Sequence, residues 1–257
     1  HLGAAAPDLD DWRDLVYRLK HPGHAVRIAL VGKYVGLHDA YLSVHEDLLH
    51  AAAYHGYTLQ LDWVDAEEVE RDGAFDRLEQ ADGIVVPGGF GERGIEGKIK
   101  AARFARKNKL PYLGLCLGLQ VMVIDLAREV LGDPNVNSAE FAPDTPHPVI
   151  DLMLEQRGIT NMGGTMRLGS YPCDLVEGSK AHKAYGKKRI TERHRHRYEI
   201  NNKYREVLQQ AGMLWSGLSP DGRLVEIGEL RDHPWMVGSQ FHPEFKTRPN
   251  SAHPLFR

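Results

Sequence analysis

Short apolar runs alternate with longer segments of helical spacing along most of the chain. The runs at 26–31, 58–64, 83–86, 112–115 and 235–241 have the composition of strands buried on both faces. Between them, the segments at 40–55, 67–80, 95–107 and 117–131 predict helices. This alternation predicts an α/β fold, with an open, mostly parallel sheet flanked by helices. Two later runs, 214–218 and 224–230, flank a Ser-Pro-Asp-Gly turn and predict a hairpin.

The join between the strand at 112–115 and its helix carries Cys116. Gly114 and Gly118 lie two residues on either side of it, as a tight strand-to-helix turn requires, because side chains there would collide. A free cysteine, with a pKa of about 8.5, is mostly protonated at neutral pH, but a helix N-terminus stabilises the thiolate. A lone cysteine is more often a small buried hydrophobe. The flanking glycines favour a nucleophile elbow.

Two other loops carry chemistry that suits such a nucleophile. The glycine-rich loop at 87–94 follows a predicted strand and can turn its backbone N–H groups towards an oxyanion, although it matches neither common phosphate-binding pattern. His242 and Glu244 follow the last predicted strand, and residues two apart in an extended segment face the same side. The carboxylate can therefore hold one imidazole nitrogen and leave the other for the thiol.

A basic segment at 187–197 remains ambiguous from its residues alone. It contains six lysines and arginines together with His194 and His196, against a single acid, Glu192. A solvated basic face is the default interpretation, a phosphate-binding patch is the second, and a metal site from the two histidines is the least favoured. Glu140 lies in a loop rich in proline and asparagine, where an acid is usually just solvated.

Composition narrows the class of protein. The 257 residues carry a net charge of −3 and 26% charged residues, so neither a nucleic acid nor a membrane is an expected partner. With only two cysteines there is no disulfide framework, and a cytoplasmic location is expected. Residues 1–24 predict a linker with a short docking helix, and residues 25–257 predict one domain. Because the chain begins with His1 and shows no signal-peptide pattern, we expect it to be part of a longer protein.

The three motifs together resemble the class I glutamine amidotransferases. The resemblance is carried by Pro87-Gly-Gly, by the G-x-C-x-G elbow around Cys116, and by the pair His242 and Glu244. Longer blocks at 32–34, 88–97, 137–141, 163–169, 192–199 and 240–245 are similar, more narrowly, to the glutaminase domain of CTP synthase. The match runs from about residue 26 to the end of the chain.

The resemblance implies hydrolysis of L-glutamine to glutamate and ammonia. Cys116 would be the nucleophile, His242 the base and Glu244 its orienting partner, with no metal in the site. Backbone N–H groups of Gly89 and Leu117 would hold the oxyanion, while an acid and a guanidinium would hold the amino acid end of the substrate. The glutamine-binding set that the resemblance implies is Gly89, Leu117, Gly118, Leu119, Gln120, Glu140 and Arg197.

The resemblance also implies a partner. An N-terminal synthetase domain, absent from this chain, would use the ammonia to aminate UTP that ATP has phosphorylated, with Mg²⁺ as cofactor and GTP as activator. Glutamine hydrolysis itself would need no cofactor. The family also suggests a homo-oligomer, a tetramer.

The sequence departs from the family pattern at two places, and two alternative functions are weighed against this interpretation. The stretch at 155–163 is shorter than is usual for the family, and the chain stops where the family continues into a last helix. A stand-alone cysteine hydrolase acting on γ-glutamyl bonds would share the triad but need no coupled domain. A catalytically dead binding module would be expected to lack Cys116, His242 or Glu244, and all three are present.

Overall fold

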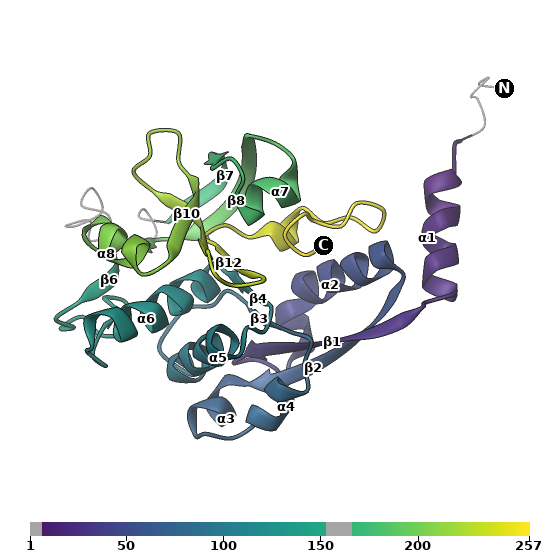
Figure 1. Ribbon diagram of the computed structural model, residues 1–257. Coiled ribbons are helices and arrows are strands. Elements are labelled where there is room, and N and C mark those ends of the chain that lie inside the picture. Colours follow the sequence, from purple (N-terminus) through teal and green to yellow (C-terminus); the bar gives the residue numbers. More distant parts are fainter. Residues whose placement is uncertain (1–6, 153–165) are drawn as a thin grey trace.

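A nine-stranded sheet forms the centre of the computed structural model, which describes residues 7–152 and 166–257 (Figure 1). The strand order is β2-β1-β3-β4-β12-β11-β10-β7-β8. The first five strands in this order are mutually parallel, and the other four extend the sheet through antiparallel pairs. The predicted α/β fold is thus confirmed, as is the hairpin, which is formed by β10 and β11.

The strands of this sheet have the following bounds: β1 His24–Gly32, β2 Tyr57–Asp65, β3 Gly83–Val86, β4 Tyr112–Leu115, β7 Arg167–Leu175, β8 Arg189–His196, β10 Met213–Leu218, β11 Val225–Leu230 and β12 Met236–Ser239. A separate three-stranded sheet consists of β5 Asn137–Ser138, β6 Pro148–Leu152 and β9 Tyr198–Ile200. The expected short stretch at 155–163 lies outside the described residues.

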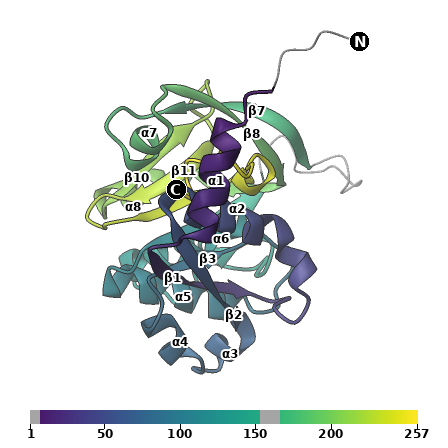
Figure 2. The same cartoon turned by 90° about the vertical axis from the view of Figure 1, so that its right-hand side faces the viewer.

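Helices cover both faces of the sheet (Figures 1 and 2). Their bounds are α1 Asp10–Lys20, η1 His38–Tyr41, α2 Leu42–His55, α3 Ala66–Glu70, α4 Phe75–Glu79, α5 Ile95–Asn108, α6 Leu117–Leu131, α7 Lys180–Tyr185, η4 Asn202–Tyr204, α8 Arg205–Gln210 and η5 Pro243–Phe245. Neighbouring residues of β4 point to opposite faces: Tyr112 packs with residues of α5 and α6, and Leu113 packs with residues of α2. The sheet therefore has two apolar cores, one on each face.

The helix that follows β4 is held in place by a buried ion network as well as by apolar packing. Residues 117–127 of α6 are all buried, as its nearly continuous apolar surface predicts. Asp125 on this helix is fully buried, and its two oxygens accept from Arg103 at 2.8 Å and from Arg106 at 2.7 Å, both on α5. A buried carboxylate needs such partners, because an unpaired charge in the interior is costly. These bonds fix α6 against α5.

One predicted helix is wrong. The segment 67–80 forms two short helices, α3 and α4, and not one weak helix. The break contains Asp72 and Ala74, which have positive φ values of 59° and 61°. A helix cannot continue through a residue in this left-handed region, so the chain turns between Glu70 and Phe75.

The N-terminal helix lies beside α2 and stands apart from the rest of the molecule (Figures 1 and 2). It begins at Asp10, with Leu9 at the N-cap position, while the carboxylate of Asp8 accepts from the Asp10 N–H. Leu15 is its buried side chain, and Trp12 remains 47% exposed. A docking helix within 1–24 thus matches the local structure, and its service as a linker stays a prediction.

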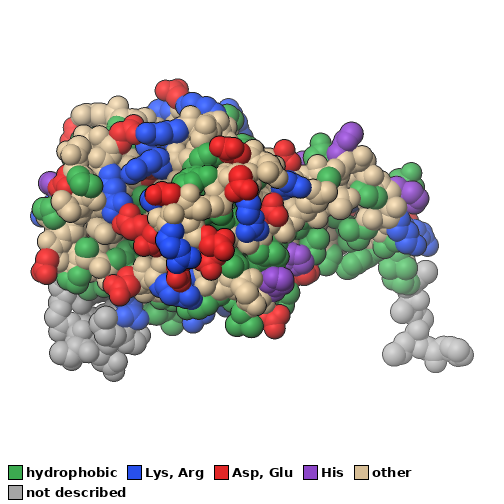
Figure 3. Space-filling model, turned by 90° about the horizontal axis from the view of Figure 1, so that it is seen from below, with side chains coloured by type: hydrophobic (Ala, Val, Ile, Leu, Met, Phe, Trp, Pro, Cys, Tyr) green, Lys and Arg blue, Asp and Glu red, His purple; other side chains and the backbone are tan. Residues whose placement is uncertain are grey.

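Charges of both signs are interspersed over the face of the molecule seen in Figure 3. This mixture agrees with the small net charge of −3. Within 7–152 and 166–257, no helix is long and apolar enough to cross a membrane.

Candidate active site

Cys116 lies at the turn between β4 and α6, with backbone angles that only a tight elbow produces. Its φ is 54° and its ψ is −98°, an unfavourable conformation for a residue with a side chain. Its N–H donates to the Ser239 carbonyl at 2.7 Å, and its own carbonyl accepts from Leu119 N–H at 3.1 Å. The strained backbone is therefore held by the neighbouring strand and by the first turn of the helix.

The two flanking glycines are required by close backbone contacts. A Cβ on Gly114 would lie 2.5 Å from the carbonyl carbon of Gly118, and a Cβ on Gly118 would lie 2.2 Å from the Val86 oxygen. Real Cβ atoms do not approach other atoms so closely. The elbow can therefore press against the end of β3 only because both positions lack a side chain.

Three neighbouring parallel strands deliver the candidate groups to one edge of the sheet. β3 leads into Pro87 and the glycine loop, β4 leads into Cys116, and β12 leads through Gln240 to His242. The loop lies against both side chains, since a Cβ on Gly88 would be 2.8 Å from His242 Cε1 and 3.5 Å from Cys116 Cβ. The glycine loop, the elbow and His242 thus meet at one edge of the sheet.

His242 and Glu244 form a buried pair beside the thiol. The two side chains are joined by a hydrogen bond of 2.7 Å between His242 Nδ1 and Glu244 Oε1. Burial lowers the pKa of His242, but the contact with Cys116 and the hydrogen bond to Glu244 together raise it to about 10. At neutral pH the imidazole is thus a proton donor, ready to protonate a leaving group beside the sulfur.

A cavity of about 330 Å³ opens onto these residues. Cys116 and His242 line it together with Gly89, Phe90 and Arg195. Further walls come from Tyr34, from 39–44 in η1 and the start of α2, and from Phe245. A small polar molecule can therefore reach the thiol, although Cys116 is only 4% exposed.

Glu140 and Arg197 approach each other but do not line this cavity. Glu140 Oε1 accepts from the Gly91 N–H at 3.3 Å. Burial raises the pKa of Glu140, while the Gly91 hydrogen bond and the charges of Arg197 and Lys33 oppose that rise. Arg197 is half-buried, and its Nε is buried without a hydrogen-bond partner. This nitrogen is thus a donor that the described residues leave unused.

The predicted glutamine-binding turn forms the first turn of α6. Leu117, Gly118, Leu119 and Gln120 are all buried there. Gly89 contacts it, since a Cβ at that position would lie 3.5 Å from Leu117 Cδ2. Gln120 Nε2 donates to the Tyr198 carbonyl at 3.2 Å and to Gln240 Oε1 at 3.3 Å. The turn thus connects the elbow to β9 and to the residue that follows β12.

Two lysines under the glycine loop were missed by the sequence reasoning. Lys33, directly after β1, donates to the Phe90 carbonyl. Lys98 on α5 is fully buried, with Nζ 3.5 Å from the Pro87 carbonyl and 3.6 Å from the place of a Cβ on Gly89. A buried lysine is rare unless paired, but the sequence around it, Glu96-Gly97-Lys98, reads as an ordinary polar helix start.

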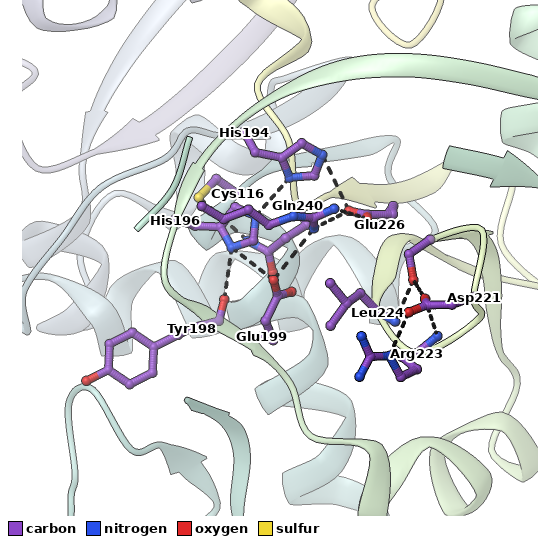
Figure 4. Close-up of polar contacts among 12 residues, drawn as sticks. Cys116, His194, His196, Tyr198, Glu199, Asp221, Arg223, Leu224, Glu226 and Gln240 are labelled. Carbon is purple, nitrogen blue, oxygen red and sulfur yellow. Dashed lines mark hydrogen bonds and ion pairs between the residues drawn. The ribbon is translucent and has the colours of Figure 1, made fainter. Parts of the chain in front are cut away.

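Within the basic segment at 187–197, residues 189–196 form strand β8, in which Ile190, Glu192, His194 and His196 are buried and the residues between them are exposed. The default interpretation, a solvated basic face, fits Arg193 and Arg195 but is wrong for the histidines. His194 Nδ1 lies 2.8 Å from His196 Nε2, and His194 Nε2 lies 3.5 Å from Glu226 Oε2 (Figure 4).

An arginine completes this buried cluster. Arg167 donates to both oxygens of Glu226, at 3.2 and 2.7 Å. Burial, assisted by the charge of Arg167, lowers the pKa of His194 to about 2 and that of His196 to about 3. The two histidines are therefore neutral hydrogen-bonding groups beneath the active site, beside the ion pair that Arg167 forms with Glu226.

Comparison with known proteins agrees with this geometry. The family model described as glutamine amidotransferase class-I matches residues 36–257. The chain is 60% identical over 257 residues to a CTP synthase of Dehalococcoides mccartyi and 62% identical over 256 residues to one of Chloroflexus aurantiacus. It spans 47% of the length of each of these relatives.

Among solved structures, the fold is similar to the Trypanosoma brucei CTPS glutaminase domain with bound acivicin. The TM-score is 0.85 and the sequence identity is 40%, and the match covers 90% of this chain and 91% of the other. Similarity of sequence and of fold thus extends over the whole site described above.

Proposed function

The chain belongs to the class I glutamine amidotransferases and, within them, to the glutaminase domains of CTP synthases, and from this membership we propose that it hydrolyses L-glutamine to glutamate and ammonia. The observation that carries the proposal is the contact between Cys116, at a strained elbow, and His242, whose other nitrogen bonds Glu244 at 2.7 Å. Nucleophile, base and orienting acid are thus in sequence along one edge of the sheet.

The first chemical step is attack of the Cys116 thiolate on the side-chain amide carbon of glutamine. The carbonyl oxygen becomes an oxyanion, which backbone N–H groups of Gly89 and Leu117 stabilise. Their positions support this role, because Gly89 contacts Leu117 next to the sulfur. One oxyanion donor is worth about 10²–10³ in turnover in comparable enzymes.

His242 then protonates the departing nitrogen. The carbon–nitrogen bond breaks, ammonia leaves, and a thioester remains on Cys116. Its raised pKa, about 10, keeps the proton on the imidazole until the leaving group takes it. The deprotonated imidazole next takes a proton from water, whose oxygen attacks the thioester, so that glutamate is released and the thiolate and the protonated imidazole are restored. Glu244 holds the ring orientation through both steps.

The amino acid end of the substrate is assigned to Glu140, Arg197 and the Leu117–Gln120 turn. Glu140 supplies a carboxylate for the α-ammonium group, and Arg197 supplies a guanidinium for the α-carboxylate. The proximity of their charges and the unpaired Nε of Arg197 support this assignment. Because neither lines the cavity beside Cys116, the substrate would reach from that cavity along the first turn of α6.

The released ammonia has a use in the longer protein to which we assign this domain. In water it would become mostly ammonium, which has no lone pair for attack, so it must pass directly to a synthetase domain. That domain would aminate UTP with ATP and Mg²⁺ to form CTP, with GTP as activator. The whole-chain identity to CTP synthases supports this role more than a stand-alone γ-glutamyl hydrolase.

Three further assignments rest on the same membership. Residues 1–24 would connect the synthetase domain to the glutaminase domain at 25–257. The longer protein would be a homo-oligomer, a tetramer by family resemblance. Both described cysteines are free thiols, which supports a cytoplasmic location.

The test is labelling by a chloroketone analogue of glutamine, followed by mass spectrometry. We expect one adduct, on Cys116, and we expect L-glutamine to protect against it. Cys173, which is fully buried, is an internal control for non-specific alkylation. An adduct on Cys173 alone, or none at all, would refute the proposal. Acivicin, which the Trypanosoma brucei domain binds, gives an independent probe of the same site.

A further inference from the structure

Gln240 touches the nucleophile and has no part in the mechanism above. It is fully buried one residue beyond the end of β12, and its Nε2 lies 3.7 Å from Cys116 Sγ, within reach of an N–H···S hydrogen bond (Figure 4). Its backbone N–H donates to the Glu226 carbonyl at 2.8 Å, which ties its main chain to β11. The side chain is thus placed against the sulfur by the sheet itself.

The direction of this amide is decided by Gln120, one helical turn after Cys116. The Tyr198 carbonyl can only accept, so the group of Gln120 that lies 3.2 Å from it must be the amide nitrogen. The same nitrogen lies 3.3 Å from Gln240 Oε1, which therefore accepts from it. The other end of the Gln240 amide, its N–H group, must then face Cys116.

We propose that Gln240 is a thiolate-holding residue, which donates a hydrogen bond to Cys116 Sγ and keeps the sulfur ionised and correctly oriented beside His242. Gln120 acts as its positioning residue, because it excludes the flipped amide that would turn an oxygen towards the sulfur. The inference rests on the proposed function, since it assigns a role in the activation of the same cysteine. A hydrogen bond donated to the charged form of a group favours that form.

The expected effect is about tenfold in the thiolate population, the lower end of what a hydrogen bond to a charged group contributes. Loss of the donor should therefore move the pH midpoint of Cys116 alkylation upward by about one pH unit. Turnover should fall by a similar factor while the KM for glutamine changes little, because Gln240 contacts the sulfur and lies outside the assigned glutamine-binding residues.

The experiment measures the rate of iodoacetamide alkylation of Cys116 from pH 5 to 10 by mass spectrometry. A Cys173→Ala background leaves Cys116 as the single thiol of the chain. Gln240→Met keeps the length of the side chain but removes the donor, and Gln240→Glu keeps its shape but brings a carboxylate to the sulfur. Gln210→Met, at an exposed glutamine of α8, is the matched control.

We expect the midpoint to rise in Gln240→Met, to rise further in Gln240→Glu, and to stay unchanged in Gln210→Met. Folded Gln240 variants whose midpoints coincide with that of the parent would overturn the inference, because a residue needed only for packing leaves the titration unmoved. If Gln240→Met does not fold, the isosteric Gln240→Glu carries the comparison. Failure of the chloroketone to label the parent refutes the proposed function instead, so the two failures are distinguishable.

Discussion

Lys98→Met is the substitution that tests most directly how the interior under the glycine loop is organised. Lys98 is fully buried on α5, and its Nζ has one long hydrogen bond, 3.5 Å, to the Pro87 carbonyl. Burial lowers the pKa of Lys98 from the usual 10.5 to about 7; the charge of Lys33 lowers it too, while Cys116 opposes this. Methionine fills a similar volume without a charge.

The size of the pH effect on stability follows from the difference in the protonation of Lys98 between the folded and unfolded states. From pH 7 to pH 10.5 the unfolded chain holds a proton on Lys98 that the folded chain lacks, so the stability of the parent rises with pH over this window. Each pH unit is worth about 1.4 kcal/mol, and the whole window about 5 kcal/mol. Below pH 7 Lys98 is protonated in both states, and the free-energy cost of burying its charge is constant.

The stability of Lys98→Met relative to the parent should therefore be highest at pH 7 and should decrease as the pH rises. The Pro87 carbonyl loses its partner in the variant, which costs about 1–3 kcal/mol, but this term does not depend on pH. Urea unfolding followed by tryptophan fluorescence at pH 7, 8, 9 and 10 gives the free energy of unfolding at each point. The control is Lys107→Met, at an exposed lysine of the same helix.

The informative quantity is the difference in unfolding free energy between Lys98→Met and the parent. We expect it to fall by about 1 kcal/mol for each pH unit, less than the full value of about 1.4 kcal/mol because the folded chain is still about half protonated at Lys98 at pH 7, while the Lys107→Met difference stays flat. A difference for Lys98→Met that is equally flat from pH 7 to 10 would show that Lys98 keeps its proton in the folded protein. The argument from burial would then be wrong.

Three further substitutions address the active site. Arg197→Lys should raise the KM for glutamine about tenfold with little change in kcat, because a single ammonium group replaces a guanidinium that can form two parallel hydrogen bonds with a carboxylate. Steady-state kinetics with an unchanged KM and a lower kcat would contradict the assigned role. Gly118→Ala should cost about 1–3 kcal/mol or more, since its Cβ would lie 2.2 Å from the Val86 oxygen, and a parental melting temperature would count against the elbow geometry. In the full-length protein, Cys116→Ala should abolish CTP formation from glutamine and preserve it from ammonium salts; CTP formed from glutamine at the parental rate would exclude Cys116 as the nucleophile.

Features that depend on neighbouring residues could be predicted from the sequence alone. The alternation of strands and helices, the elbow at Cys116 and the His242–Glu244 pair all depend on contacts between residues a few positions apart. The steric need for Gly114 is of this kind, because a Cβ there would meet Gly118 across the turn, whereas the need for Gly118 comes from Val86 on the neighbouring strand β3. The prediction of one helix at 67–80 overlooked the Asp72-Gly73 dipeptide, which favours a turn, and the chain breaks there with positive φ at Asp72 and Ala74.

The tertiary structure alone decided which polar groups are buried and what they contact. Along β8, arginine and histidine alternate, and because both are polar, no hydrophobic pattern shows which set faces inward. The histidines are turned inward by Glu226 and Arg167, which come from strands far away in the sequence. Lys98 and Gln240 likewise look like ordinary polar residues until α5 packs beneath the glycine loop and β12 aligns beside β4. Burial of a polar side chain depends on partners supplied by the whole fold, and local sequence does not contain them.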